Sequence, residues 1–134
     1  MDFKKLNNIG GLIIFAIAFY TYGSTIEPTT SFWDCGEYIA TSYKLEVGHP
    51  PGAPTFLLFA RVFSMFAAPE NVAYMVNMMS ALSSALTILF LFWTITYLAK
   101  KFVANEEMTT GNIIAILGSS TLGALAFTFS DTFW

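Results

Sequence analysis

Charged residues are scarce in this chain of 134 residues, of which they make up only 11%. Soluble domains carry about 25% charged residues, so an ordinary soluble domain is excluded. Hydrophobic residues make up 55% of the chain and aromatic residues 17%, and the mean hydropathy is +0.60. Because backbone polar groups in lipid must find partners within the protein, this composition predicts an all-α integral membrane protein.

Basic residues and cysteine are also few. The six Lys and Arg residues lie at the ends of segments rather than in one patch, and the net charge is only -3, so we expect no nucleic-acid partner. Cys35 is the single cysteine, which excludes an intramolecular disulfide and a cysteine metal cluster. We interpret it as a small apolar side chain in a tight turn.

Three apolar runs approach the length of roughly 17–25 residues that crosses a bilayer. They predict membrane spans at about 9–26, 72–98 and 113–129. Lys4 and Lys5 precede the first run and place the amino terminus in the cytoplasm by the positive-inside rule. A basic start and a short apolar core also resemble a signal peptide, but no Ala-x-Ala cleavage site follows, so we predict an uncleaved first helix.

The segment 53–68 has two interpretations. As a fourth span it would leave Lys100 and Lys101 outside, whereas as a helix on the outer surface it leaves them inside, where the positive-inside rule requires them. The segment is also short for a span. At 100° per residue four phenylalanines form one stripe, which is typical of an in-plane amphipathic helix: Phe56, Phe59, Phe63 and Phe66.

We therefore predict three spans and an external loop at 27–71 that carries surface helices at about 37–45 and 54–66. Pro54 suits the first turn of the second surface helix. The chain ends on an apolar run without a polar tail, so we expect it to be the first part of a longer multi-pass protein.

The external loop holds the candidate site residues, which are Asp34, Glu37, His49 and Arg61. Ionisable residues beside a span are costly to keep near lipid and often mark functional sites. Asp34 lies one turn before Glu37, so a helix starting here would direct both carboxylates to one region. There a carboxylate can accept a proton from a hydroxyl or bind a metal ion. His49 can donate to a phosphate or take a proton, and Arg61 offers a fork that suits phosphate.

Four further residues are expected to shape this loop: Gly36, Pro50, Pro51 and Gly52. Gly36 allows backbone or substrate to approach closely. The proline pair is expected to hold the following chain extended, which would fix the direction of His49.

Each polar residue also has a structural interpretation. Asp34 could cap the helix that follows it, and Glu37 could pair with Lys44. His49 could be structural, and Arg61 could reach toward lipid headgroups. Because all of the candidates lie in one loop on one side of the membrane, a shared site is favoured.

The order of features resembles the protein O-mannosyltransferases: a first span, an external acidic pair, a surface helix, and a His-Pro-Pro motif that opens a second surface helix. Two segments look still more like a bacterial O-mannosyltransferase-like multi-pass family, common in Bacteroidetes and first catalogued as a domain of unknown function: Trp33-Asp34-Cys35-Gly36-Glu37 and Leu45-Glu46-Val47-Gly48-His49-Pro50-Pro51-Gly52-Ala53-Pro54. That family belongs to the GT-C glycosyltransferases. The last five residues resemble the start of its next external motif: Ser130-Asp131-Thr132-Phe133-Trp134.

The resemblance implies the N-terminal part of a GT-C multi-helix bundle in a bacterial inner membrane, inactive by itself. It implies transfer of a sugar from a polyprenyl phosphate to a protein hydroxyl on the periplasmic face, with Asp34 as general base and Glu37 as a second catalytic acid. His49 and Arg61 are then candidates to bind the donor phosphate. The two acids are adjacent in the mannosyltransferases but separated by two residues here, so the resemblance supports Asp34 more directly. Some GT-C enzymes use a divalent metal, but with two acidic ligands in view we predict none.

Two other functions remain open from the sequence. One is a non-enzymatic subunit of a membrane assembly or transporter, in which the acids anchor a neighbouring chain. The other is a GT-C enzyme with a glycolipid acceptor. Convergence of the polar side chains on one cleft would favour transfer chemistry, whereas their dispersal over a surface would favour assembly.

Overall fold

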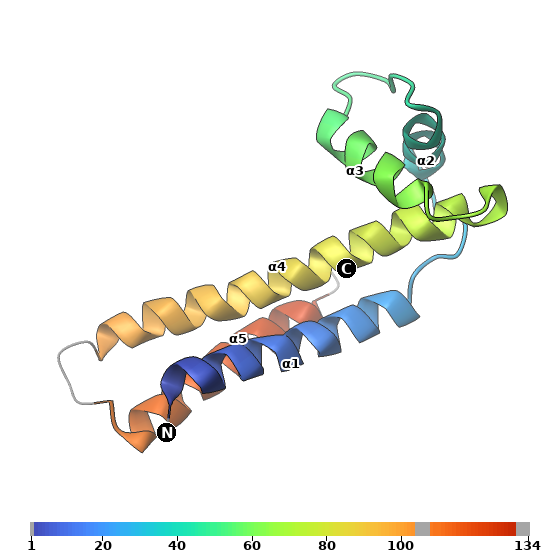
Figure 1. Ribbon diagram of the computed structural model, residues 1–134. Helices are drawn as coiled ribbons and strands as arrows, with labels where there is room; N and C mark the ends of the chain where they lie inside the picture. Colours follow the sequence, from blue (N-terminus) through green and yellow to red (C-terminus); the bar gives the residue numbers. More distant parts are fainter. Residues whose placement is uncertain (1, 104–107, 131–134) are drawn as a thin grey trace. The chain divides into compact units, whose positions relative to one another are not determined.

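The computed structural model describes residues 2–103 and 108–130, and every regular element within these ranges is helical. The final motif at 131–134 lies outside the described residues. The order of elements is shown in Figure 1: α1 (Phe3–Ser24), α2 (Cys35–Lys44), α3 (Pro54–Ser64), the 3-10 helix η1 (Pro69–Asn71), α4 (Val72–Phe102) and α5 (Thr110–Thr128).

Three of these elements are long and apolar enough to cross a membrane: α1, η1 together with α4, and α5. At 11 residues α3 is apolar but too short to span the roughly 30 Å of hydrocarbon. The predicted class, an all-α membrane protein, is therefore confirmed.

Two of the long helices, α1 and α5, begin earlier than their apolar runs do, whereas α4 begins at Val72 as predicted. The backbone N–H of Lys4 donates to Asp2 Oδ1 at 3.0 Å, so α1 starts at Phe3 rather than near residue 9. The hydroxyl of Thr109 likewise accepts from the N–H of Asn112 at 3.2 Å at the start of α5. Polar capping residues extend both helices beyond their hydrophobic stretches.

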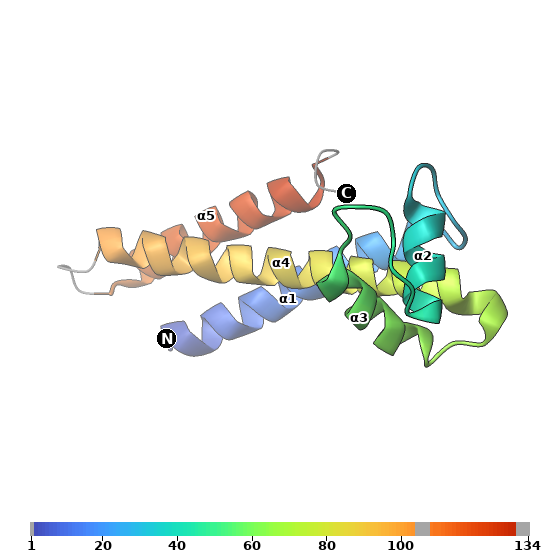
Figure 2. The ribbon, with the colours of Figure 1, turned by 90° about the horizontal axis from the view of Figure 1, so that it is seen from above.

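The chain divides into two compact units, Met1–Tyr22 with Ser83–Trp134, and Gly23–Leu82. In the first unit α1, the later part of α4 and α5 lie side by side in both views (Figures 1 and 2). A Cβ added to Gly11 of α1 would lie 2.5 Å from Trp93 Nε1 of α4, so only glycine fits this approach.

A buried hydrogen bond closes the first unit. The hydroxyl of Tyr22, on α1, donates to the carbonyl of Thr128, on α5, at 3.1 Å. Tyr22 is fully buried and Thr128 almost so. Because a tyrosine hydroxyl in an apolar environment needs a partner, this bond fixes the contact between these two helix ends.

The second unit holds the predicted external loop, and in it α2 and α3 pack against each other (Figure 2). Its apolar core combines one residue of α2, one of α3 and three of α4: Ile39, Ala60, Val72, Val76 and Met79. The side-chain amide of Asn77 donates to the carbonyls of Glu27 and Thr29 at 2.9 Å each. These bonds fasten the segment that follows α1 to the first turns of α4.

The four phenylalanines of the predicted stripe do not share one environment, and Phe66 lies after the end of α3. Phe56 and Phe63 pack against the core of the second unit, whereas Phe59 and Phe66 are 61% and 78% exposed. Two phenylalanines therefore hold α3 to the protein. The other two share an outward apolar face with three more exposed side chains, Leu58, Val62 and Met65. A helix that is apolar on both sides is suited to contact protein on one side and lipid on the other.

Cysteine labelling tests the three-span topology. In a chain freed of other reactive thiols, we expect Glu70→Cys and His49→Cys to react with an impermeant maleimide from outside, and Lys100→Cys only after permeabilisation. The physical reason is that an 11-residue α3 cannot return the chain through the bilayer. Labelling of Glu70→Cys only from the cytoplasm would contradict this topology and make α3 a fourth span.

Candidate functional site

Asp34 lies directly before α2, at the position where a side chain usually caps a helix. Its carbonyl accepts the first helical bond, from the N–H of Tyr38 at 2.9 Å, but its carboxylate makes no capping hydrogen bond. The preceding Trp33 has a positive φ of 61° and is 95% exposed. The capping interpretation of the Asp34 side chain is therefore not supported, and the carboxylate is open to other partners.

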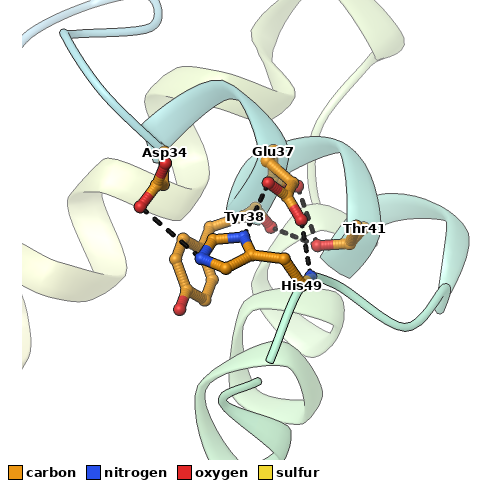
Figure 3. Close-up of polar contacts among 5 residues, drawn as sticks. All are labelled: Asp34, Glu37, Tyr38, Thr41 and His49. Atoms are coloured by element: carbon orange, nitrogen blue, oxygen red, sulfur yellow. Dashed lines mark hydrogen bonds and ion pairs between the residues drawn. The ribbon is translucent and has the colours of Figure 1, made fainter. Parts of the chain in front are cut away.

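Both carboxylate oxygens of Glu37 contact the same residue, His49, in the loop after α2 (Figure 3). Oε1 accepts the backbone N–H of His49 at 2.8 Å, and Oε2 lies 2.8 Å from His49 Nδ1. Among the described residues Glu37 forms no ion pair with Lys44. The alternative in which Glu37 pairs along its own helix is therefore not what the structure contains.

His49 brings the two acids into one cluster. With Nδ1 directed at Glu37, its other ring nitrogen, Nε2, lies 3.7 Å from Asp34 Oδ2 (Figure 3). The edge of Tyr38 supports the imidazole, with ring centroids 6.2 Å apart. Tyr38 lies one turn after Asp34, so the same helical spacing that joins the acids also brings this ring under the histidine.

The chain after His49 does not run extended, contrary to expectation. The N–H of Gly52 donates to the carbonyl of His49 at 2.9 Å, which closes a tight turn through Pro50 and Pro51. Gly52 has a φ of +68°, a conformation that favours glycine. The turn leads directly into α3, so the His-Pro-Pro-Gly segment places His49 where two helices meet.

Gly48 is the glycine that the sequence analysis missed. A Cβ added to it would lie 3.2 Å from Glu37 Oε1, whereas one added to Gly36 would meet Thr30 Cγ2 at an ordinary 3.7 Å. The close approach expected of Gly36 is thus made by Gly48. The sequence could have indicated this role, since Gly48 lies directly before His49. A carboxylate that accepts the His49 N–H must lie close to the residue that precedes it in the chain.

The charges of the pair reinforce each other. The hydrogen bonds from His49, first from its backbone and then from its ring, hold the pKa of Glu37 below its ordinary value. The hydrogen bond to Glu37, and next its negative charge, raise the pKa of His49, to which the charge of Asp34 adds. Their ordinary values are 4.5 and 6.5, so both members are charged between these pH values. Both side chains are solvent-exposed, which keeps the pair accessible and weak.

Arg61 is not brought to this cluster. Its Nη1 donates to the carbonyl of Tyr43 at 2.6 Å, and its guanidinium lies over the Tyr43 ring, 5.6 Å from the centroid. Tyr43 is in the last turn of α2, whereas Glu37 is in the first. Six residues of helix separate these positions by about 9 Å along the axis. Arg61 therefore satisfies a carbonyl at the end of α2 and links α2 to α3.

The cluster contains three groups that could share a cation. One ligand atom each from Asp34, Glu37 and His49 lies within 4.8 Å of the others. The sequence indicated two acidic ligands, and His49 is a third donor, of a type that divalent metals accept. A cation bound here would compete with the hydrogen bond between Glu37 and His49.

Chemically, the arrangement places one carboxylate, which makes no capping hydrogen bond, 3.7 Å from a histidine that is oriented by a second carboxylate. Asp34 can accept a proton, and Glu37 fixes which nitrogen of His49 faces it. Three of the four candidate polar residues converge in one solvent-exposed cluster. The side chains of Asp34 and His49 are 60% and 45% exposed, so a substrate can reach them.

Comparison with known proteins gives consistent results. The model of the family described as the N-terminal domain of protein O-mannosyl-transferase TMEM260 matches residues 34–134. The chain is 33% identical to protein O-mannosyl-transferase TMEM260 of Mus musculus over 86 residues, 64% of this chain and 12% of that protein. It is 29% identical to protein O-mannosyl-transferase tmem260 of Dictyostelium discoideum over 126 residues, 92% of this chain and 13% of that protein. No solved structure matches.

The chain thus spans about an eighth of the length of these curated relatives. The matched region begins at Asp34 and includes every residue of the polar cluster. On this match the chain belongs to the protein O-mannosyl-transferase TMEM260 family, in the region of its N-terminal domain.

Proposed function

We propose that this chain is the N-terminal part of a GT-C glycosyltransferase that moves a sugar from a polyprenyl-phosphate donor to a protein hydroxyl. Its site faces the periplasm, its amino terminus is cytoplasmic, and its membrane is the bacterial inner membrane. The names of the relatives support protein O-mannosyl transfer, and the resemblance of the motifs to the bacterial family supports the donor and the compartment. The observation that carries the proposal is the Asp34 carboxylate, which lies at a helix start without capping it and beside an oriented histidine.

The reaction is a direct displacement at the sugar carbon. Asp34 accepts the proton of the acceptor hydroxyl while the hydroxyl oxygen forms a bond to the anomeric carbon. The bond from that carbon to the donor's phosphate oxygen breaks, and polyprenyl phosphate leaves with the electron pair. A positioned general base contributes about 10²–10⁴-fold to such a step.

His49 acts on Asp34 rather than on the leaving phosphate. The base must lie about 3 Å from the acceptor oxygen, and that oxygen about 3 Å from the sugar carbon. In a displacement the leaving group is on the far side of this carbon. His49 Nε2, 3.7 Å from Asp34 Oδ2, is therefore on the acceptor side. We assign it as a positioning residue, oriented by Glu37, that holds Asp34 in place.

Arg61 keeps a structural role in this proposal. Its guanidinium donates a hydrogen bond to the Tyr43 carbonyl at the end of α2. The length of α2 between Tyr43 and Glu37 argues against a phosphate bound by both Arg61 and His49. We therefore expect the positive groups that stabilise the leaving phosphate to lie in the remainder of the full-length protein.

Mass spectrometry of periplasmic glycoproteins, with and without the gene, tests the function. Loss of hexose from Ser or Thr peptides in the deletion strain is the expected result. Loss of a sugar only from glycolipids would favour the glycolipid-acceptor enzyme. An unchanged glycan inventory together with loss of a membrane complex would favour the assembly subunit.

Replacement of the base gives the most direct prediction. In the full-length enzyme Asp34→Asn should lower the initial rate by about 10²–10⁴-fold, because the amide has the same shape but cannot accept the proton. Glu70→Gln removes an acid of the same external loop and is the matched control, expected to stay within a few-fold of wild type. An Asp34→Asn rate also within a few-fold would remove Asp34 from catalysis.

The pH dependence tests the pairing of Glu37 with His49. Because the pKa of His49 is raised, the positive charge that His49 brings to the pair is fully present below pH 6.5 and is lost as the pH rises through the raised value. Because the pKa of Glu37 is lowered, the negative charge that Glu37 brings to the pair is fully present above pH 4.5 and is lost as the pH falls through the lowered value. Glu37→Gln should therefore move the alkaline limb of the rate profile to lower pH.

The matched control for this profile is Glu46→Gln, which removes a carboxylate from the same loop without touching His49. Its alkaline limb should coincide with that of wild type. If Glu37→Gln and Glu46→Gln gave identical limbs, the pair would have no part in activity.

The glycines give a steric prediction. Gly48→Ala should lower the rate by about three- to tenfold, because its Cβ at 3.2 Å requires the Glu37 carboxylate to move by a few tenths of an ångström, and a misplacement of about 1 Å can cost 10²-fold. Gly36→Ala, with an ordinary contact at 3.7 Å, should remain within about threefold. Initial rates of the two full-length variants decide this, and a larger loss for Gly36→Ala would show that the acceptor packs against residue 36.

A further inference from the structure

A cavity of about 310 Å³ lies in the second unit beside the polar cluster. Its lining combines residues of α2, of the turn before α3, of α3 itself and of the first turns of α4: Cys35, Tyr38, Ile39, Ala53, Phe56, Val76, Asn77 and Ser80. Most of these side chains are apolar or aromatic. A cavity of about 150 Å³ lined by apolar residues already accepts benzene, so this one has room for an aromatic side chain or two aliphatic ones.

The wall of the cavity is continuous with the site. Cys35 follows Asp34 directly, and consecutive Cα atoms are about 3.8 Å apart. Tyr38, which lines the cavity, contacts both the His49 ring and the Phe56 ring, with centroids 6.2 Å and 5.6 Å apart. One residue therefore belongs both to the wall of the cavity and to the surroundings of the His49 imidazole.

Two polar groups at the cavity are available to a ligand. Asn77 uses its amide nitrogen on the carbonyls of Glu27 and Thr29, which leaves its side-chain oxygen as an acceptor. The Ser80 hydroxyl makes no hydrogen bond among the described residues. An apolar cavity with a few such groups is typical of a ligand site in which the polar atoms fix orientation.

The direction of the reaction decides which substrate reaches this cavity. The acceptor oxygen must touch Asp34, whereas the lipid phosphate departs on the opposite side of the sugar carbon. An extended acceptor chain covers about 3.3–3.6 Å per residue. When the modified hydroxyl lies at Asp34, the residues one or two positions away along the acceptor chain therefore lie near Cys35 and Tyr38. The cavity is therefore closer to the acceptor chain than to the lipid donor.

We propose that this cavity is an acceptor subsite, which seats an apolar side chain of the protein substrate within two residues of the modified Ser or Thr. The Ser80 hydroxyl and the Asn77 oxygen would bond the peptide backbone next to that side chain. This inference rests on the proposed function, since it takes Asp34 as the base for a protein hydroxyl.

The experiment uses the full-length enzyme with its lipid donor and a series of acceptor peptides that differ only in the residue beside the hydroxyl. Wild type should use a Leu or Phe peptide at least tenfold better, in kcat/KM, than an Asp peptide, which is in the range a hydrophobic pocket supplies. Ser80→Leu fills the cavity and should abolish this preference without changing the KM for the donor. Ser83→Leu, an exposed position one turn further along α4, should leave the preference intact.

A second measurement needs no substituted enzyme. A peptide with Cys beside its acceptor hydroxyl, activated as a mixed disulfide with 2-thiopyridine, should exchange with the Cys35 thiol to form a disulfide and release pyridine-2-thione. The Leu peptide, but not the lipid donor, should suppress this cross-link. Equal use of all peptides by wild type would overturn the subsite. A raised donor KM in Ser80→Leu, or protection of Cys35 by the donor alone, would assign the cavity to lipid and also overturn it. If the cross-link forms but wild type transfers no sugar, the subsite stands and the proposed reaction fails.

Discussion

The site depends on one carboxylate that binds the same residue twice. Glu37 accepts both the backbone N–H and the ring N–H of His49, and so holds a loop residue twelve positions along the chain against the first turn of α2. The backbone contact fixes where the loop passes, and the ring contact fixes which nitrogen faces Asp34. The turn to Gly52 and the edge of Tyr38 hold the same residue from other sides, so the two bonds to Glu37 complete the placement of His49.

An exposed ion pair contributes little stability by itself, so the apolar core must supply most of the order. Ile39 and Ala60 bring α2 and α3 together over α4, and Arg61 adds a bond to the end of α2. Tyr38 connects the two layers, because its ring touches Phe56 on the core side and His49 on the solvent side. Packing thus sets the positions of the helices, and Glu37 selects the arrangement of the loop between them.

Much of this could be predicted from the sequence, and the remainder could not, for physical reasons. Length and hydropathy identify the long helices, because a segment in lipid must be both apolar and helical. Residue type identifies Asp34, Glu37 and His49 as candidates. Their mutual contacts depend on how the chain turns at His49 and Gly52, and no helical period describes a turn. For the same reason the partner of Arg61 and the role of Gly48 were missed, since each depends on a segment at least eleven residues away.

The failure of the phenylalanine stripe has a related cause. A periodic pattern gives the angle between side chains on α3 but not which side meets the protein, and an apolar residue satisfies either environment. Phe56 is drawn inward because Tyr38 offers its ring an edge-on contact, which the pattern of α3 alone does not contain. The same contact forms a wall of the cavity beside Asp34. Phe56, which packs inward rather than facing lipid, thus connects the packing of α3 with the candidate site at the start of α2.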